Sequence, residues 1–250
     1  MSERRDLLIE IGTEELPPKA LFDLALAFEK GIGEGLAKAG LPNDAIRRFA
    51  TPRRLAVLIH RLPAQQPDRQ SERRGPAPRA AFGPDGKPTK AAEGFARSCG
   101  VSVAELQRLE TDKGSWLIHV STEAGAATAD LIPGIVETAL AGLPIPKRMR
   151  WGDRDEEFVR PVHWVVLLFG DDIIPASIMG VKTGRETRGH RFHRPEPIPL
   201  TAPSEYARQL AFEGKVIADF AERRDKVRAQ AEAVASQLHG TAVIKPELLD

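Results

Sequence analysis

The sequence predicts an α+β fold, in which mixed or antiparallel sheets pack against helices and the C-terminal part is helical. Two observations indicate this class: short apolar runs typical of strands, and apolar residues that recur at helical spacing between them. The order in which these segments follow one another suggests a mixed arrangement. With 42% hydrophobic and 28% charged residues in 250, the composition is that of an ordinary globular protein.

The first expected elements are a strand, a helix and a second strand. The apolar run 7–11 ends at Gly12 and reads as a strand. Pro17 and Pro18 suit the first turn of a helix, where a missing N–H costs nothing. That helix has one apolar face and carries three glycines expected to weaken its end, Gly31, Gly33 and Gly35. Residues 54–60 read as the next strand.

Residues 63–90 are rich in Pro, Gly, Arg and Gln, which predicts a long exposed loop or arm. Thr89 is placed to cap a helix that runs to about residue 98 and ends at Gly100. A third strand is expected over 115–121, followed by an amphipathic helix over 131–140.

The next segments read as two strands, 162–169 and 173–179, joined in a hairpin across 170–172. Residues 182–200 are polar and rich in Arg, Gly and Pro, without a predicted element. Two helices are expected in the C-terminal part, over 204–212 and 217–238, and a short strand over 242–244.

We therefore expect two domains: an α+β domain over 1–200, and a helical segment over 201–250 that leads into a further C-terminal part. The abrupt end of the chain after a predicted strand suggests that polypeptide normally continues.

Charge and composition exclude several classes of protein. The formal net charge is only +1, so any nucleic acid would have to be bound by local patches. A single cysteine, Cys99, excludes an intrachain disulfide and suits a reducing compartment. No signal peptide is expected, and the longest apolar run is too short to span a bilayer. We expect a cytoplasmic protein without membrane contact.

Three carboxylates stand near the end of the first strand: Glu10, Glu14 and Glu15. Such a group could serve acid–base catalysis or bind a metal ion. We favour a structural role, in which Glu14 and Glu15 precede the first helix and interact with its positive end.

Arg53 and Arg54 are adjacent at the start of a strand, so their side chains point to opposite faces. One could pair with a carboxylate at the edge of the core while the other meets a phosphate or a partner protein. The sequence does not separate the two roles.

The segment 147–152, KRMRWG, is the densest group of cations around an aromatic residue. Arg150 could contact RNA phosphates while Trp151 stacks on a base. Four acidic residues follow within 153–157 and offset the local positive charge. We therefore favour a surface turn in which Trp151 covers the edge of a core.

A second cationic cluster lies in a loop that contains glycine. Its His190 and His193 have an H-x-x-H spacing, which invites a metal hypothesis, but no third ligand is evident. Packing together with polar contact to a partner or RNA is the favoured interpretation. The cluster consists of Arg185, Arg188, His190, Arg191, His193 and Arg194.

Catalytic signatures are missing from the sequence. It has no G-x-x-x-x-G-K-[ST] phosphate loop and no G-x-S-x-G elbow. Nothing in the sequence supplies a base for Cys99, which is expected to be inert. The sequence therefore argues against a self-contained active site, and no catalytic residue, metal or cofactor is assigned to this chain.

Several unusual strings carry a resemblance to a known family. Two further stretches, 81–101 and 216–227, match in the same order, so the match spans nearly the whole chain. Together they resemble the beta subunit of bacterial two-subunit glycyl-tRNA synthetase. The five principal strings are LLIEIGTEELPPKAL (7–21), ATPRRLAV (50–57), KRMRWG (147–152), FVRPVHWVV (158–166) and TRGHRFH (187–193).

This resemblance implies a role in the ATP-dependent attachment of glycine to tRNA(Gly) by an α2β2 enzyme. It implies that the alpha subunit carries the catalytic core and binds ATP and Mg²⁺, while the beta subunit supplies most of the tRNA recognition. Family members are longer, so the chain resembles an N-terminal fragment that is inactive alone. No catalytic residue of the family can be carried onto a position here.

We expect a set of side chains to contact tRNA or the alpha subunit without doing bond chemistry. Three alternatives stay open: a purely structural scaffold between subunits with no RNA contact, an editing-type hydrolase domain, and an unrelated metal enzyme centred on His190 and His193. The expected contact residues are Arg53, Arg54, Arg150, Trp151, Arg160, Arg188, His190 and Arg191.

Overall fold

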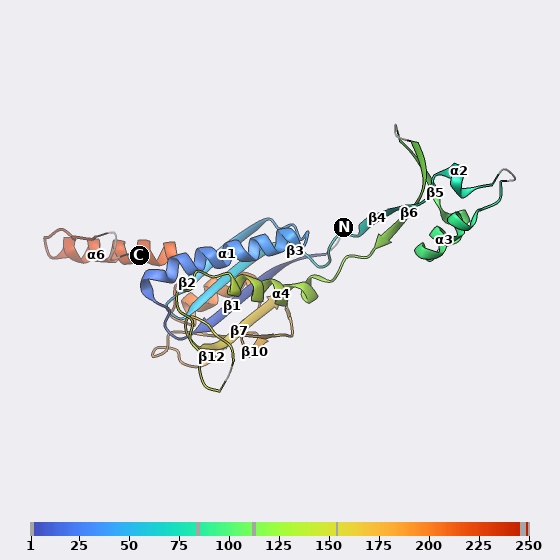
Figure 1. Ribbon diagram of the computed structural model, residues 1–250. Coiled ribbons are helices and arrows are strands. Elements are labelled where there is room, and N and C mark those ends of the chain that lie inside the picture. Colours follow the sequence, from blue (N-terminus) through green and yellow to red (C-terminus); the bar gives the residue numbers. More distant parts are fainter. Residues whose placement is uncertain (1–2, 84–85, 112–113, 154, 246–248, 250) are drawn as a thin grey trace. The chain divides into compact units, whose positions relative to one another are not determined.

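A computed structural model describes residues 3–83, 86–111, 114–153, 155–245 and 249 (Figure 1). The chain forms two compact units. One consists of Met1–Gln66 together with Ala126–Asp250, and the other of Pro67–Gly125. Both contain helices and strands, which confirms the predicted α+β class.

The larger unit is built on one mixed sheet with the strand order β2-β3-β1-β7-β10-β9, and β8 pairs with β7. All neighbouring strands are antiparallel except β10, which runs parallel to β7. The strands are β1 (Arg4–Thr13), β2 (Ala45–Thr51), β3 (Arg54–Pro63), β7 (Val162–Phe169), β8 (Asp172–Ile173), β9 (Ser177–Ile178) and β10 (Val181–Gly184).

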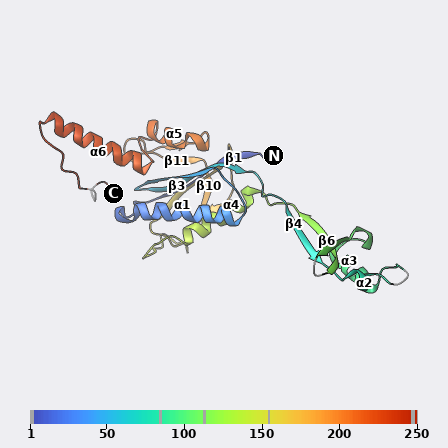
Figure 2. The ribbon, with the colours of Figure 1, turned by 90° about the horizontal axis from the view of Figure 1, so that it is seen from above.

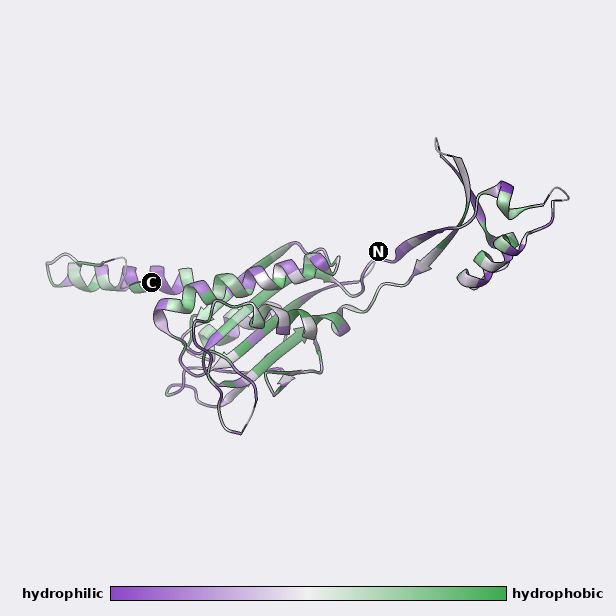
Figure 3. Ribbon diagram, in the orientation of Figure 1, coloured by the Kyte–Doolittle hydropathy of each residue, from purple (hydrophilic) through white to green (hydrophobic). Residues whose placement is uncertain are grey.

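Strand β1 occupies the centre of this sheet, between β3 and β7, and both of its faces are covered. Leu7, Ile9 and Ile11 face the core that contains α1 (Leu21–Lys38) and α4 (Thr128–Ala141). Leu8 faces a second core that contains α5 (Tyr206–Phe212). Figure 2 shows α1 and α4 on one side of the strands and α5 on the other. Burial on both faces explains the continuous apolar run, which Figure 3 shows in the hydrophobic colour.

The glycines of α1 do not weaken the end of the helix as expected, because α1 continues through them to Lys38. Two of them lie against α4. A Cβ atom at Gly35 would lie 2.5 Å from Ile135 Cγ2, and one at Gly31 would lie 3.1 Å from Ala139 Cβ. These glycines therefore let the two helices approach closely.

The expected domain boundary near residue 200 does not coincide with the limits of the two units. Leu200, Tyr206, Leu210 and Ala218 are buried in the second core, against Leu8 and other residues of the main sheet. The segment around α5 is therefore part of the larger unit. Helix α6 (Phe220–Gln237) follows and has no buried residue.

The smaller unit corrects the expectation of a long loop over 63–90. This segment contains β4 (Arg69–Arg74) and α2 (Pro78–Ala81), which join β5 (Gln107–Thr111), β6 (Gly114–Glu123) and α3 (Lys90–Cys99). Polar β4 is an edge strand in the order β4-β6-β5. Its backbone pairing does not depend on an apolar sequence, which is why composition did not reveal it. Thr89 caps α3, and Gly100 ends it with φ 74°, as predicted.

The strands predicted over 7–11, 54–60, 115–121 and 162–169 are confirmed, as are the helices in α1, α4, α5 and α6. The 3₁₀ helix η1 (Pro18–Ala20) occupies the predicted proline turn, and η2 (Val103–Glu105) and η3 (Pro203–Glu205) are two more such helices. Strand β8 forms the expected hairpin with β7.

Three other expectations about the elements are wrong. The strand expected over 173–179 is divided between β8 and β9, because Pro175 between them has no N–H to donate. Residues 242–244 form no strand. The polar stretch 182–200 contains part of β10 and a two-stranded ribbon of β11 (Glu186–Arg188) and β12 (Pro197–Pro199). No helix in the described ranges has the length and apolar character needed to cross a membrane.

Candidate nucleic-acid interface

Arg54 lies in the interior at the start of β3, with only 2% of its side chain exposed. Its Nη1 lies 3.8 Å from Glu10 Oε1, and its Nε donates to Thr51 Oγ1 at 3.1 Å. Its Nη2 donates to the backbone carbonyl of Arg188. Of the two roles left open by the sequence, Arg54 therefore has the internal one: it ties the end of β11 to the main sheet.

Glu10 is the fully buried partner of this guanidinium. Its carboxylate also accepts hydrogen bonds from Trp164 Nε1 at 2.5 Å and from Thr187 Oγ1 at 2.7 and 2.9 Å. A buried charge is tolerated when it is paired and hydrogen-bonded in this way. Glu10 is thus a structural carboxylate that joins β1, β7 and β11.

Tyr206 packs beside this network, with its ring 5.2 Å from the ring of Phe49. Burial raises the pKa of the Tyr206 hydroxyl well above its usual range, and the negative charge of Glu10 adds to the shift. Among the described residues, the hydroxyl has no hydrogen-bond partner of good geometry. The phenol is therefore held neutral inside the second core.

Glu14 and Glu15 pair with side chains outside the helix that follows them. Their expected interaction with the positive end of that helix stays a prediction. Glu14 Oε1 lies 2.9 Å from His163 Nε2 and 3.6 Å from Arg53 Nη2. Glu15 Oε1 lies 3.2 Å from Arg191 Nη1. The two carboxylates thus pair with basic side chains from three other segments of the larger unit.

Arg53 has the more exposed of the two adjacent guanidinium groups, at 26% of its side chain. Its Cζ lies 5.9 Å from the ring centroid of Trp164. Its Nε is buried and has no hydrogen-bond partner within the described part of the chain. Since buried donors are normally satisfied, Arg53 retains unused capacity to bind an oxygen atom.

The loop 187–193 is held in place by its backbone. The N–H of His190 donates to the carbonyl of Gly214 at 2.7 Å. A Cβ atom at Gly189 would lie 2.7 Å from that same oxygen, so only glycine permits the approach. Arg191 then lies over the exposed ring of Phe192, with its Cζ 5.0 Å from the centroid.

The two histidines of this loop do not form a metal centre with other residues. His190 Nδ1 accepts the backbone N–H groups of Phe192 and His193, each at 3.3 Å. The rings of His190 and His193 lie 4.4 Å apart. The described residues include no cluster of three or more His, Cys, Asp or Glu side chains able to hold a metal ion.

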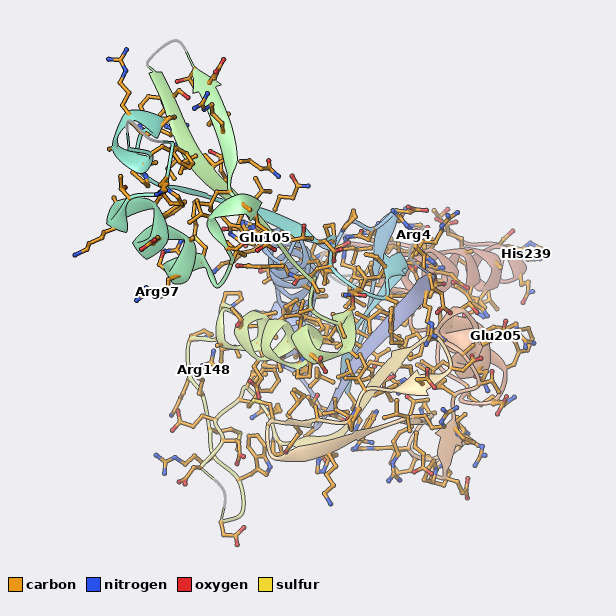
Figure 4. All side chains as sticks on the ribbon, turned by 90° about the vertical axis from the view of Figure 1, so that its right-hand side faces the viewer. Arg4, Arg97, Glu105, Arg148, Glu205 and His239 are labelled. Atoms are coloured by element: carbon orange, nitrogen blue, oxygen red, sulfur yellow. The ribbon has the colours of Figure 1, made fainter. Side chains whose placement is uncertain are left out.

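The segment 147–152 has the arrangement of a surface turn. Arg150 Nε donates to Glu157 at 3.0 Å, so the acidic run that follows does offset its charge. Figure 4 marks Arg148 on the loop after α4, where its guanidinium donates to the carbonyl of Ala141 at 2.9 Å. Trp151 is partly buried and packs against the first core.

Arg160 and Arg188 complete the expected set of contact residues. The Nε of Arg160 donates to the backbone carbonyl of Glu15 at 3.0 Å. The side chain of Arg188 is exposed, while its carbonyl accepts from Arg54. Contact of either side chain with RNA or a subunit stays a prediction.

A cavity of about 490 Å³ brings several of these residues together. Arg53, Arg54, His190 and Arg191 line it, whereas Arg150, Trp151, Arg160 and Arg188 do not. Two further cations in its wall, Lys215 and Arg223, were missed at the level of sequence. Lys215 directly precedes the stretch 216–227 and Arg223 lies inside it. Because that stretch carries part of the family resemblance, it could have indicated these two residues.

The chemistry of this cavity suits an anion. Glu15 is the one carboxylate among the lining residues that the structure describes. The Thr51 hydroxyl is engaged by Arg54, and His190 Nδ1 by the backbone. The cavity therefore offers positive charge and N–H donors in place of an activated nucleophile.

Fold and site together define a class: an α+β protein whose larger unit carries a cavity lined by several arginine and lysine residues. The family model described as glycyl-tRNA synthetase beta subunit matches residues 7–250, and the chain belongs to that family.

Three curated relatives illustrate the similarity, and each is a glycine–tRNA ligase beta subunit. Those of Hahella chejuensis, Marinobacter nauticus and Chromohalobacter salexigens are 55%, 52% and 53% identical to this chain over 98% of its length. The chain spans 36%, 36% and 35% of these proteins, about a third of their length.

Proposed function

We propose that this chain acts as an N-terminal part of the beta subunit of a two-subunit glycine–tRNA ligase. It contributes contact with tRNA(Gly) and assembly with the alpha subunit during ATP-dependent attachment of glycine to tRNA. The observation that carries the proposal is the cavity around Arg53, Arg191 and Lys215, set in a chain of this family. Such a site binds phosphate through charge and N–H donors.

In this proposal the chemistry occurs on the alpha subunit of an α2β2 assembly in the cytoplasm. ATP and Mg²⁺ bind there, and this chain holds no cofactor. Its cations act by orienting the RNA and by neutralising its charge. The chain alone is accordingly expected to show little or no glycylation, and co-purification with the alpha subunit followed by an activity assay against the full-length beta subunit checks this.

Salt titration of tRNA(Gly) binding tests the RNA contact directly. We expect the logarithm of the binding constant to fall linearly with the logarithm of salt concentration, by about 0.9 per phosphate contact on a duplex and about 0.7 on a single strand. Reversing the charge of Arg191 should lower the slope, whereas reversing Lys30, which pairs with Glu34 on α1, should not. A flat salt response would remove the phosphate role.

A purely structural scaffold between subunits is the second candidate. Helix α6 favours it, since its 18 residues include none that is buried while Val227 and Val234 are about half exposed. The two valines lie seven residues apart and so share one face of the helix, and a partner could cover that face. Charge reversal at Arg150 or Arg188 that spoils assembly with the alpha subunit but leaves tRNA affinity intact would support this candidate.

A further inference from the structure

The cavity has the size and the walls of a site for one small ligand. Its volume of about 490 Å³ lies within the roughly 300–1,000 Å³ of typical ligand pockets. Three segments far apart in the sequence form most of it: the turn 51–54, the loop 189–192 and the segment 215–217. Glu15 and Arg223 of α6 complete the lining. All of them belong to the larger unit.

The positive charge in these walls is only partly compensated. Glu10 pairs with Arg54, Glu15 with Arg191 and Glu14 with Arg53. Among the described residues, Lys215 has no such carboxylate partner. Burial lowers the pKa of the Arg223 guanidinium; the charge of Asp219 opposes this shift, and that of Arg54 adds to it. An anion entering the cavity would offset this remaining charge.

Two local features also point to a ligand. The buried Nε of Arg53 lacks a hydrogen-bond partner in the described ranges, so it is a donor available to an incoming oxygen. Lys215 has φ 58°, a left-handed conformation that is strained for a residue with a side chain. Such strain collects at functional sites, and Lys215 is one of the residues that line the cavity.

An aromatic and apolar surface complements these cations. The side chain of Phe192 is 76% exposed, although it lies in the lining of the cavity. Pro52, Val216 and Ile217 extend the apolar lining. Unpaired bases stack on such exposed rings, while their phosphates are bound by nearby cations.

We propose that this cavity binds one unpaired ribonucleotide, whose base stacks on Phe192 and whose phosphate is held by Arg53, Arg191 and Lys215. The inference rests on the proposed contact with tRNA and narrows it to a single-stranded part of the RNA. A base pair within a duplex does not fit this arrangement, because its base faces are already stacked on neighbouring pairs. The aromatic ring therefore makes the site selective for unpaired residues.

Fluorescence anisotropy with the 250-residue chain tests this assignment. The probes are a labelled single-stranded ribotetranucleotide, the same sequence closed in a hairpin duplex, and unlabelled AMP as competitor. The variants are Phe192→Ala and Lys215→Gly, the latter chosen because glycine accepts the left-handed backbone without strain. Phe212→Ala and Lys182→Gln are the matched controls, since both residues are exposed and neither lines the cavity.

We expect each cavity variant to weaken binding of the single strand about tenfold, as loss of one stacked base or one phosphate contact does. The controls should leave it unchanged, and binding of the hairpin should change less than twofold. If AMP displaces the labelled tetranucleotide at a concentration similar to that of the unlabelled tetranucleotide, the site also binds free nucleotides. If AMP does not displace it, the site requires a nucleotide that is part of an RNA chain. Unchanged single-strand binding in both cavity variants overturns the inference, as does an equal loss for hairpin and single strand.

Binding of tRNA(Gly) in the same assay distinguishes failure of the proposed tRNA contact from failure of the nucleotide site. If tRNA binds with the expected salt dependence but the cavity variants bind the tetranucleotide normally, the cavity inference fails and the proposed function stands. If AMP or the tetranucleotide binds in the cavity but tRNA does not bind, the proposed tRNA contact fails and the nucleotide site stands.

Discussion

Among single residues, the buried pair Glu10 and Arg54 connects the most segments of the larger unit. Their charges are buried together, and their hydrogen bonds reach Thr51, Thr187 and Trp164. Removal of one member of such a buried pair typically costs about 3–5 kcal/mol, because the other charge is left uncompensated. The same contacts hold the loop after β11, so the fold of the core and the position of the cavity wall depend on one ion pair.

Tyr206 gives a direct optical test of this buried network, because it is the only tyrosine in the chain. Its pKa is raised by burial, so the phenol should stay neutral in the folded protein above pH 10, where an exposed tyrosine ionises. The linked stability is fully present below about pH 10 and decreases as pH rises toward the folded-state pKa.

We therefore expect phenolate absorbance at alkaline pH to appear only together with loss of far-UV circular dichroism. Titration of the same protein in denaturant, where ionisation should occur near pH 10, is the control. A phenolate signal at pH 10 with the secondary structure intact would show that Tyr206 is accessible to solvent.

At the scale of elements, the contact between α1 and α4 predicts different effects for two glycine substitutions. Gly35 lies against the neighbouring helix, whereas Gly134 has free space beside it. Replacing Gly35 with alanine should lower the free energy of unfolding by about 1–2 kcal/mol, because overpacking against Ile135 exceeds the gain in helix propensity. Replacing Gly134, an exposed glycine of α4 whose Cβ would meet no atom within 4 Å, should raise it by about 0.5–1 kcal/mol.

Denaturant unfolding of the two variants and the parent chain measures both changes. The two positions share the substitution and the helical environment, so they differ chiefly in what the added methyl group meets. An equal gain in stability at both positions would contradict the close packing of α1 on α4.

Sequence patterns revealed those helices and strands whose apolar side chains recur at a regular spacing. The buried runs of β1 and β7 and the apolar face of α1 follow directly from hydrophobic periodicity. Strand β2 was missed because Arg47 and Arg48 interrupt it, and β4 because its side chains are polar. Both strands are specified by backbone pairing with a neighbour, which leaves little trace in composition.

The candidate site was predictable to a similar extent. The cationic loop 187–193 and the arginine pair at 53–54 were recognised from local sequence. Their meeting with Lys215 in one cavity was not, because it requires three distant segments to be brought together by the second core. The internal role of Arg54 depends on Thr187 and Glu10, which no local pattern connects to it.

For the whole molecule, the smaller unit is an insertion between neighbouring points of the larger one. The N–H of Gln66 donates to the carbonyl of Ala126 at 3.0 Å, and Gln65 pairs with Ala127 in a β-bridge. The smaller unit has its own small core around Ala81 and Leu117, and neither core of the larger unit includes any of the residues that the structure describes within 67–125.

Replacing 67–125 by a short Gly-Ser linker should therefore leave the larger unit folded. We expect cooperative thermal unfolding and the same alkaline protection of Tyr206 as in the parent chain. The control is a chain in which 201–217 is replaced by the same linker; it removes Tyr206 and Leu210 from the second core and should unfold. Loss of cooperative unfolding on removal of 67–125 would show that the larger unit depends on the inserted one.

The central place of β1 has a consequence during synthesis on the ribosome. One edge of β1 can pair as soon as β3 emerges, but the other must wait for β7, roughly 100 residues later, or on the order of 5–20 s at common elongation rates. Throughout that interval the nascent chain exposes an apolar strand with an unpaired edge, the kind of surface that recruits neighbouring chains. Chaperone protection of the emerging chain is thus needed most between translation of residues 63 and 169.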